Sequence, residues 1–305
     1  MQAQAAADAL AAGDLIILPT ETVYGLAADA ANPAAVARLY EAKGRPRFNP
    51  LIAHVADWTM AARVAALDER ARRLAEAFWP GPITFVAPIA DPSLVCDLAR
   101  AGLDTVAVRS PAHTVAQAVI AAFGRPIVAP SANRSGRPSP TTFADAVAET
   151  GQAAAVALDG GACAIGLEST VVALLDGPPR LLRPGAITRA EIEALVGPLA
   201  EAEADARRSP GRLTRHYAPS APLRLDAEAP RPGEAYLAFG PAPAGAAVFN
   251  LSPTGDLREA AARLFSALRA ADALFPAAIA IAPIPERDLG EAINDRLRRA
   301  AGYVG

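Results

Sequence analysis

Leu18-Pro-Thr-Glu-Thr-Val-Tyr-Gly-Leu-Ala27 is the stretch of sequence that decides the fold. It begins at the end of the apolar run 15–18 and is followed by small and hydroxyl-bearing residues. This pattern is typical of a buried strand that presents polar side chains to a cleft. The basic turn Lys43-Gly-Arg-Pro-Arg-Phe-Asn-Pro50 follows one helix later. We therefore predict a strand over residues 15–21 and a cleft shared with that turn.

The composition bounds the class of protein. At 305 residues the chain can bury a large core and form two domains. A net charge of -3 argues against a protein that coats nucleic acid by bulk electrostatics. The sequence shows neither a membrane-length apolar run nor a signal-peptide pattern, so we expect a cytoplasmic protein without membrane contact. Its two cysteines suit buried thiols, and its three histidines without paired cysteines do not suit structural zinc.

Periodicity and turn residues predict alternating strands and helices in the first two thirds of the chain. Asn32-Pro33 opens one helix, Thr141 or Thr142 caps another, and Thr188 with Glu191 forms a capping box. The predicted helices span 1–12, 33–42, 59–66, 68–78, 113–123, 142–150 and 188–197, and the further strands span 50–55, 83–89, 105–109, 126–130, 155–158, 169–175 and 180–183. We predict an α/β fold with a mixed sheet, in which the last two strands form an antiparallel hairpin.

The pattern changes after residue 198. Residues 199–222 have the composition of a linker, rich in Ala, Glu, Arg and Pro. Beyond them, strands predicted over 235–239, 246–251 and 277–281 alternate with helices over 256–271 and 289–301. We predict three parts: a catalytic domain over 1–198, a linker over 199–222, and a small Rossmann-like α/β domain over 223–305.

Polar and basic residues recur at the ends of the predicted strands. Such cations and donors, gathered in one cleft, would bind a polyanion, and a nucleoside triphosphate together with a small carboxylate is the natural ligand. The sequence has no Walker A loop, no Gly-x-Gly-x-x-Gly after the first strand and no Gly-x-Ser-x-Gly elbow, so nucleotide binding would be unconventional. The residues are Thr20, Thr22, Lys43, Arg45, His54, Arg109, Ser131, Asn133, Ser169, Thr170 and Arg183.

Each of these residues also has an ordinary structural explanation. Lys43 and Arg45 follow a helix, where the helix dipole favours cations. His54, inside an apolar strand, could be a core histidine bonded to a carbonyl, and Ser131-Ala-Asn133 could be a simple turn. The residue types alone leave both explanations open.

The motifs taken together, in this order, resemble the YrdC-like threonylcarbamoyl-AMP synthases. The resemblance covers about residues 5–200, and the tail from Ser209-Pro-Gly211 through His216-Tyr-Ala-Pro219 resembles the longer, two-domain branch of that family. The matching motifs are Leu18-Pro-Thr-Glu-Thr-Val-Tyr-Gly-Leu26, Lys43-Gly-Arg-Pro46, Asn49-Pro-Leu-Ile52, Trp79-Pro-Gly-Pro-Ile-Thr84, Val108-Arg-Ser-Pro-Ala-His113, Pro130-Ser-Ala-Asn133, Glu168-Ser-Thr-Val-Val172 and Leu182-Arg-Pro-Gly185.

This resemblance implies a YrdC-like twisted mixed parallel and antiparallel sheet flanked by helices. It implies a nucleotidyltransferase that converts L-threonine, bicarbonate and ATP into threonylcarbamoyl-AMP and pyrophosphate, the first step of tRNA threonylcarbamoyladenosine modification. Magnesium would bind through the ATP phosphates, with no protein metal site and no tightly bound organic cofactor. A downstream threonylcarbamoyl transferase complex would take the product, so tRNA would be met only indirectly.

The resemblance also implies roles for individual residues. Lys43 and Arg45 would be catalytic. ATP would be bound by Lys43, Arg45, Ser131, Asn133, Arg183 and Tyr217, and threonine by Thr22, His54, Arg109 and Ser169. A lid would be formed by Arg212, Arg215, His216 and Tyr217. The chain departs from the family at Arg212-Leu213-Thr214, where Met-Lys-Tyr is common, so any contact by that Lys or Tyr is lost.

Two other functions compete with this one. A basic cleft in a YrdC-like domain could bind double-stranded RNA, as in a ribosome-maturation protein, although the acidic net charge counts against it. A similar domain also handles carbamoyl phosphate inside hydrogenase-maturation enzymes, but the zinc-finger and acylphosphatase segments expected there are missing from this sequence.

Overall fold

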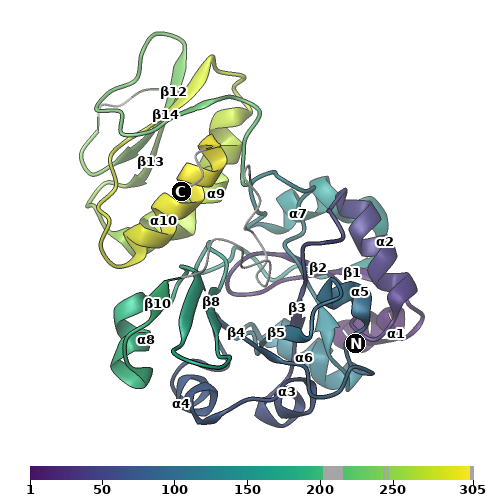
Figure 1. Cartoon of the computed structure of the whole chain (residues 1–305). Coiled ribbons are helices and arrows are strands. Elements are labelled where there is room, and N and C mark those ends of the chain that lie inside the picture. The colour runs from purple at the N-terminus through teal and green to yellow at the C-terminus, as the bar shows by residue number, and fades with distance from the viewer. Residues whose placement is uncertain (202–215, 243–244, 246, 303–305) are drawn as a thin grey trace.

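The computed structural model describes residues 1–201, 216–242, 245 and 247–302. In this part of the chain the strands form a ten-stranded sheet and a separate four-stranded sheet (Figure 1). Both sheets carry helices, so the predicted α/β class is confirmed. The linker predicted over 199–222 lies largely outside the described residues.

The ten-stranded sheet is mixed. Its order is β10-β9-β8-β4-β5-β3-β6-β2-β1-β7, and it contains parallel pairs such as β3 with β5 and antiparallel pairs such as β4 with β5. The strands are β1 (Leu15–Leu18), β2 (Gly25–Asp29), β3 (Ile52–His54), β4 (Ile83–Pro88), β5 (Thr105–Arg109), β6 (Ile127–Val128), β7 (Ala154–Ala157), β8 (Thr170–Ala173), β9 (Arg180–Arg183) and β10 (Ala200–Glu201).

The strand predicted over residues 15–21 is too long. β1 ends at Leu18 because Pro19 has no backbone N–H to donate and the Thr20 hydroxyl accepts hydrogen bonds from the next turn. The chain then turns and returns as β2, antiparallel to β1, a strand that the sequence analysis missed. The residues between Leu18 and Gly25 therefore lie on a turn at the sheet edge, where their side chains can face a cavity.

Helices cover both faces of this sheet. Leu15 and Ile17 pack into one core, whereas Ile16 and Leu18 pack into the other, which explains the unbroken apolar run of β1. The helices are α1 (Gln2–Ala11), α2 (Pro33–Lys43), α3 (Trp58–Val64), α4 (Glu69–Phe78), α5 (Asp97–Arg100), α6 (Thr114–Phe123), α7 (Phe143–Thr150) and α8 (Arg189–Val196), with a 3-10 turn η1 (Gly151–Ala153).

Local sequence signals set several helix ends as predicted. The Asn32 side chain accepts hydrogen bonds from the N–H groups of Ala34 and Ala35 at the start of α2. Thr188 and Glu191 form the predicted capping box of α8. α2 ends at Lys43, the first residue of the basic turn that approaches the cavity.

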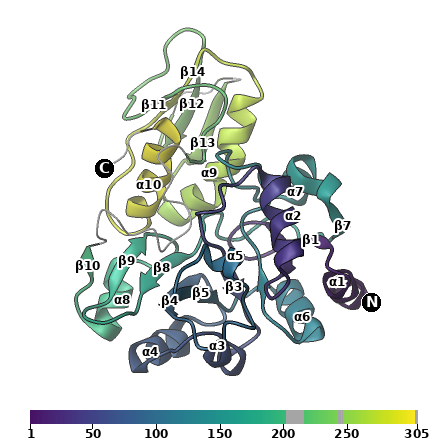
Figure 2. The same ribbon diagram turned by 45° about the vertical axis from the view of Figure 1, so that its right-hand side comes forward.

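The four-stranded sheet is parallel in every described strand pair, with the order β11-β14-β12-β13. Its two helices lie on the side that faces the ten-stranded sheet (Figure 2). We call this assembly the four-stranded unit. It consists of β11 (Leu223–Arg224), β12 (Glu234–Phe239), β13 (Val248–Ser252), α9 (Leu257–Asp272), β14 (Ala278–Ile281) and α10 (Leu289–Ala301).

The predicted hairpin is present and its strands are held very close. β8 and β9 pair antiparallel, and Gly185 follows β9. A Cβ at Gly185 would lie 2.4 Å from the Thr170 nitrogen and 2.6 Å from the Glu168 oxygen, both of them backbone atoms that cannot rotate away. This close approach fixes the backbone of residues 168–170 at the end of the sheet.

We expect Gly185→Ala to lower the free energy of unfolding by about 3 kcal/mol, because the two backbones must separate to admit the methyl group. Gly177→Ala in the turn of the same hairpin is the control. Gly177 has φ +87° but open space around it, so this change should cost about 1 kcal/mol. Urea unfolding measures both values, and equal losses would refute the steric explanation.

Candidate active site

One cavity gathers side chains from the turn after β1, from the ends of β3, β5 and β9, and from the segment after residue 215. Most of its lining residues are polar or charged, and three of them are arginines, although the net charge of the chain is negative. The described residues that line it are Thr22, Val23, Arg45, Leu51, Ile52, His54, Arg109, Ala129, Pro130, Ser131, Glu168, Ser169, Arg183, His216 and Tyr217.

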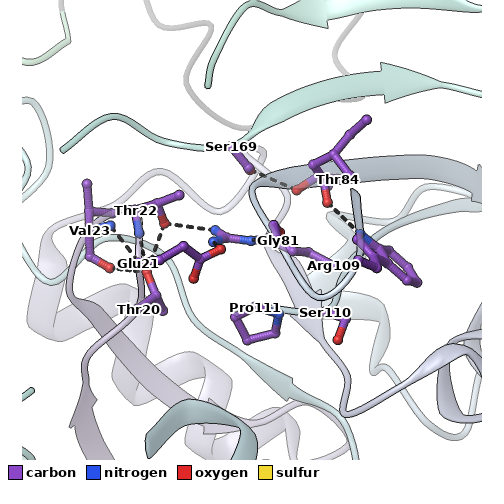
Figure 3. Close-up of polar contacts among 12 residues, drawn as sticks. Thr20, Glu21, Thr22, Val23, Gly81, Thr84, Arg109, Ser110, Pro111 and Ser169 are labelled. Carbon is purple, nitrogen blue, oxygen red and sulfur yellow. Dashed lines mark hydrogen bonds and ion pairs between the residues drawn. The ribbon is translucent and has the colours of Figure 1, made fainter. Parts of the chain in front are cut away.

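The turn after β1 is held by its own hydroxyl groups. The Thr20 hydroxyl donates to the Val23 carbonyl at 2.6 Å and lies 2.8 Å from the Thr22 hydroxyl (Figure 3). Both threonines are buried. This local network satisfies the backbone of the turn and leaves Thr22 facing Arg109.

Arg109 is fixed by three groups from two other parts of the chain. Its Nε donates to the Gly81 carbonyl at 3.2 Å, its Nη1 to the Thr22 hydroxyl at 2.9 Å, and its Nη2 to the Glu21 carboxylate at 2.5 Å (Figure 3). Burial raises the pKa of Glu21, but the charge and hydrogen bond of Arg109 outweigh burial, so that pKa lies below its ordinary value. Glu21 therefore stays ionised and occupies one edge of the guanidinium.

Ser169 joins the hairpin to the neighbouring strand. Its hydroxyl lies 2.8 Å from the Thr84 hydroxyl of β4 and accepts from Arg183 Nη2 at 3.2 Å. Arg183 also donates to the Ser169 carbonyl at 2.9 Å. Burial lowers the pKa of Arg183, yet an arginine still carries its charge at neutral pH. A fixed cation thus stands beside a fixed hydroxyl on the cavity wall.

His54 is a neutral histidine with a defined tautomer. Its Nδ1 lies 3.1 Å from the Ile52 carbonyl, which can only accept, so Nδ1 carries the proton and Nε2 keeps a lone pair. Burial, followed by the nearby Arg109 charge, lowers the pKa of His54 to about 3. His54 therefore offers a hydrogen-bond acceptor to the cavity that it lines.

The basic turn places Arg45 on the cavity wall but Lys43 behind it. Arg45 donates to the Pro50 carbonyl at 3.1 Å, and burial lowers its pKa to about 10. Lys43 donates to the carbonyls of Ser131 and Asn133 and does not line the cavity. Burial, and then the Arg45 charge, lowers the pKa of Lys43 well below its ordinary value.

His216 and Tyr217 close the cavity from the segment that follows residue 215. Both are buried, their rings meet edge to face at 3.9 Å, and Tyr217 stacks on Phe265 of α9 at 5.4 Å. Tyr217 has φ +65°, a conformation that is uncommon for a bulky residue. Its buried hydroxyl has no hydrogen-bond partner among the described residues.

The structure thus brings together nine of the residues that the sequence analysis selected. Four others, Thr20, Lys43, Asn133 and Thr170, lie outside the lining; the Asn133 amide bonds to the carbonyls of Arg134 and Arg137. Arg212 and Arg215 lie outside the described residues. The nine are Thr22, Arg45, His54, Arg109, Ser131, Ser169, Arg183, His216 and Tyr217.

Two acidic residues at the site were missed. Glu21 sits inside the motif that opened the sequence analysis, and its place between two threonines could have singled it out. Glu168 begins the Glu-Ser-Thr motif and lines the cavity. Its oxygens accept from the Ser139 hydroxyl at 2.5 Å and from Arg296 Nε at 2.8 Å. No local signal links it to Arg296, which is 128 positions away.

The described cavity wall does not suit a divalent cation held by the protein. Such a site needs several oxygen ligands, chiefly carboxylates. Glu168 is the carboxylate among the described lining residues, and both of its oxygens already accept hydrogen bonds. The surplus of guanidinium groups favours an anion instead.

Comparisons with known families cover both sheets. Residues 8–185 match a family profile described as "Telomere recombination". Residues 187–302 match a profile described as "Threonylcarbamoyl-AMP synthase, C-terminal domain". Together the two profiles account for nearly all of the chain.

Curated relatives match over most of their length. A threonylcarbamoyl-AMP synthase of Pyrococcus abyssi is 42% identical, with 95% of this chain and 91% of the relative aligned. One of Bacillus subtilis is 39% identical, with 98% and 92% aligned. A crystal structure of a P. abyssi protein complexed with L-threonine superposes with a TM-score of 0.91 at 39% identity, covering 99% of this chain and 94% of that one. This likeness confirms the predicted YrdC-like fold.

We expect acidification to destabilise the fold through His54. Its pKa falls from 6.5 to about 3 on folding, so the unfolded chain binds the proton first as the pH drops below about 6.5. Between pH 7 and pH 5 this linkage should remove on the order of 2 kcal/mol from the free energy of unfolding. Urea unfolding of the wild type and of His54→Gln at both pH values isolates the contribution. If the two proteins lose stability equally, His54 is not neutral in the fold.

Proposed function

The chain belongs to the threonylcarbamoyl-AMP synthase family, and we propose that it is a nucleotidyltransferase that joins L-threonine, bicarbonate and ATP into threonylcarbamoyl-AMP with release of pyrophosphate. The observation that carries the proposal is the cavity itself. It combines one arginine suited to a carboxylate, Arg109, with two suited to phosphates, Arg45 and Arg183.

The threonine end of the cavity is formed by Thr22, His54, Arg109 and Ser169. Arg109 can grip the amino-acid carboxylate through its planar fork. The unprotonated Nε2 of His54 can accept a hydrogen bond from the substrate's hydroxyl or ammonium group. Glu21 already uses one edge of Arg109, so the substrate carboxylate must share the guanidinium with it or displace it.

ATP binds at the other end, where we assign Lys43, Arg45, Ser131, Asn133, Arg183 and Tyr217. Arg45 and Arg183 are buried cations that offset the charge of the phosphates. Lys43 donates to two carbonyls in this structure and does not line the cavity, so contact with ATP requires its ammonium to move toward the cavity. We expect Lys43 and Arg45 to act at the reacting phosphates.

The reaction needs two bond-forming steps. The threonine amine attacks the carbon of bicarbonate, the N–C bond forms and water leaves, giving a carbamate. A carbamate oxygen then attacks the α-phosphorus of ATP, and the bond to the pyrophosphate oxygen breaks. The described lining residues include no cysteine or lysine nucleophile. We therefore assign catalysis to positioning, to exclusion of water from the labile intermediate and to stabilisation of the departing pyrophosphate.

Magnesium is assigned to the ATP phosphates rather than to protein ligands, in keeping with the cationic wall of the cavity. The product is labile and must pass to a separate transferase that acts on tRNA, so contact with tRNA is indirect. In the part of the chain that the structure describes, no helix has the length and apolar character to cross a membrane. We propose that the reaction takes place in the cytoplasm, where ATP and tRNA are present.

The RNA-binding alternative is not favoured. The curated relatives that match nearly the whole chain bear the synthase name, and the solved relative of similar length is complexed with L-threonine. The net charge of -3 also opposes bulk binding of RNA.

We expect pyrophosphate release from ATP to require both L-threonine and bicarbonate. Lys43→Ala should lower the rate by about 100-fold or more, because it removes a cation assigned to the reacting phosphates. A coupled pyrophosphate assay with each co-substrate omitted in turn measures both effects. ATP left intact by a folded wild-type protein under all conditions would reject the synthase proposal.

Removing the hydroxyl oxygen of Tyr217 tests whether this residue contacts ATP. We expect Tyr217→Phe to keep the stacking on Phe265 and to preserve stability, since the hydroxyl has no partner among the described residues. Loss of a hydrogen bond to the nucleotide should raise the KM for ATP by about threefold to tenfold. Steady-state kinetics with thermal unfolding as the control measures this, and an unchanged KM would remove Tyr217 from the ATP site.

A further inference from the structure

The four-stranded unit contacts the segment 165–169, whose residues Glu168 and Ser169 line the proposed active site. This segment belongs to the ten-stranded part of the chain and leads into β8. Three consecutive residues of it, Gly166, Leu167 and Glu168, each contact the four-stranded unit in a different way.

Gly166 packs against α9 at a distance that only glycine allows. A Cβ there would lie 2.5 Å from the Cα of Ala262 and 2.6 Å from the Ala261 carbonyl oxygen, and its φ of +74° also excludes most side chains. The next residue, Leu167, is fully buried in the core of the four-stranded unit together with Tyr217. The backbone on both sides of Glu168 is thereby tied to that unit.

Glu168 is held by Arg296 of α10. Arg296 Nε donates to the Glu168 carboxylate at 2.8 Å, Nη1 to Asp295 at 2.6 Å and Nη2 to the Pro184 carbonyl at 3.0 Å. Arg296 is fully buried, and its guanidinium lies 5.3 Å from the centre of the Tyr217 ring. One side chain thus bridges the Glu-Ser-Thr segment, the end of the hairpin and the aromatic residue that closes the cavity.

The charge of Glu168 explains why such a bridge matters for an anion site. Burial raises the pKa of Glu168, but the Arg296 and Arg183 charges outweigh burial, and the net shift keeps the carboxylate ionised. A bare carboxylate on the wall would repel phosphates and would compete with them for Arg183. Arg296 offsets that charge from behind the wall. Because a buried ion pair contributes little net stability compared with apolar packing, stability alone does not explain this one.

We propose that Arg296 is a positioning residue of the synthase, through which the four-stranded unit completes the ATP end of the active site by orienting and neutralising Glu168. The inference rests on the proposed function. It gives the four-stranded unit a part in catalysis, although none of the described lining residues belongs to that unit's helices or strands. Arg296 acts through Glu168 and Tyr217 and does not itself line the cavity.

The experiment compares Arg296→Met and Arg296→Lys with Arg298→Met. Arg298 lies on the same helix, is half exposed and pairs with Glu286 outside the cavity, so its variant controls for loss of an arginine from α10. Each protein is assayed for pyrophosphate release with ATP and L-threonine varied separately, at a temperature below its thermal transition. Glu168→Gln and the double variant Arg296→Met with Glu168→Gln complete a double-mutant cycle.

The proposal expects both Arg296 variants to raise the KM for ATP by about tenfold, with the KM for L-threonine changed less than about twofold. The KM for ATP of the double variant should not exceed that of the single variant with the higher KM, because Arg296 acts through Glu168. If Arg296→Met does not fold, the double variant, which leaves no unpaired buried charge, and Arg296→Lys decide the question.

Three results would overturn the inference. The Arg296 variants could have the same two KM values as Arg298→Met, or they could raise the KM values for ATP and L-threonine equally. The effects of Arg296→Met and Glu168→Gln on the KM for ATP could also multiply in the double variant. Loss of stability with unchanged KM values would also overturn it, since it would mean that Arg296 only docks the unit. A wild type and an Arg298→Met protein that both release no pyrophosphate would instead reject the proposed function.

Discussion

Burial of cationic side chains around one cavity is the constraint on which the rest of the structure depends. A charge removed from water is tolerated only where hydrogen-bond acceptors or opposite charges surround it. Here the acceptors are carbonyls and carboxylates. Lys43, Arg109 and Arg296 each join parts of the chain that are distant in sequence, whereas Arg45 bonds to the nearby Pro50 carbonyl. The five are Lys43, Arg45, Arg109, Arg183 and Arg296, all of them buried.

These buried charges determine the protonation states of the neighbouring titratable residues. His54 stays neutral because burial and Arg109 both oppose its protonation, so it can act only through its free ring nitrogen. Glu21 and Glu168 stay ionised because arginines stand beside them. The same cavity thus holds fixed cations, neutral acceptors and compensated carboxylates, an arrangement suited to binding an amino acid and a polyphosphate side by side.

The four-stranded unit shares its core with the site. Val23, Leu167 and Tyr217 belong to the hydrophobic core of that unit, although Val23 and Leu167 come from segments that belong to the ten-stranded part. Arg269 of α9 adds an ion pair with Glu149 at 3.0 Å and a hydrogen bond to the Pro138 carbonyl. The two sheets are therefore joined by apolar packing and by charge, close to the residues assigned to ATP.

Sequence alone determined most elements and the residue types of the site, because helix caps, apolar periodicity and short motifs are local signals. The capping box at Thr188 and the bounds of β5 and β9 followed from such signals. Strand β2 was not predicted, because its glycine and alanine residues around Leu26 lack the β-branched side chains typical of strands. The preceding strand was accordingly predicted to run to residue 21, although β1 ends at Leu18 and the chain then turns.

Only the tertiary structure decided which of these residues meet. His54 and Arg109 lie side by side because β3 and β5 pair in parallel, a register that neither strand encodes by itself. Lys43 donates to the carbonyls of Ser131 and Asn133, about ninety positions away in the sequence. Glu168 accepts a hydrogen bond from Arg296 of α10, near the end of the described chain. Contacts of this kind follow from how sheets and helices pack over long sequence separations, and local periodicity carries no information about them.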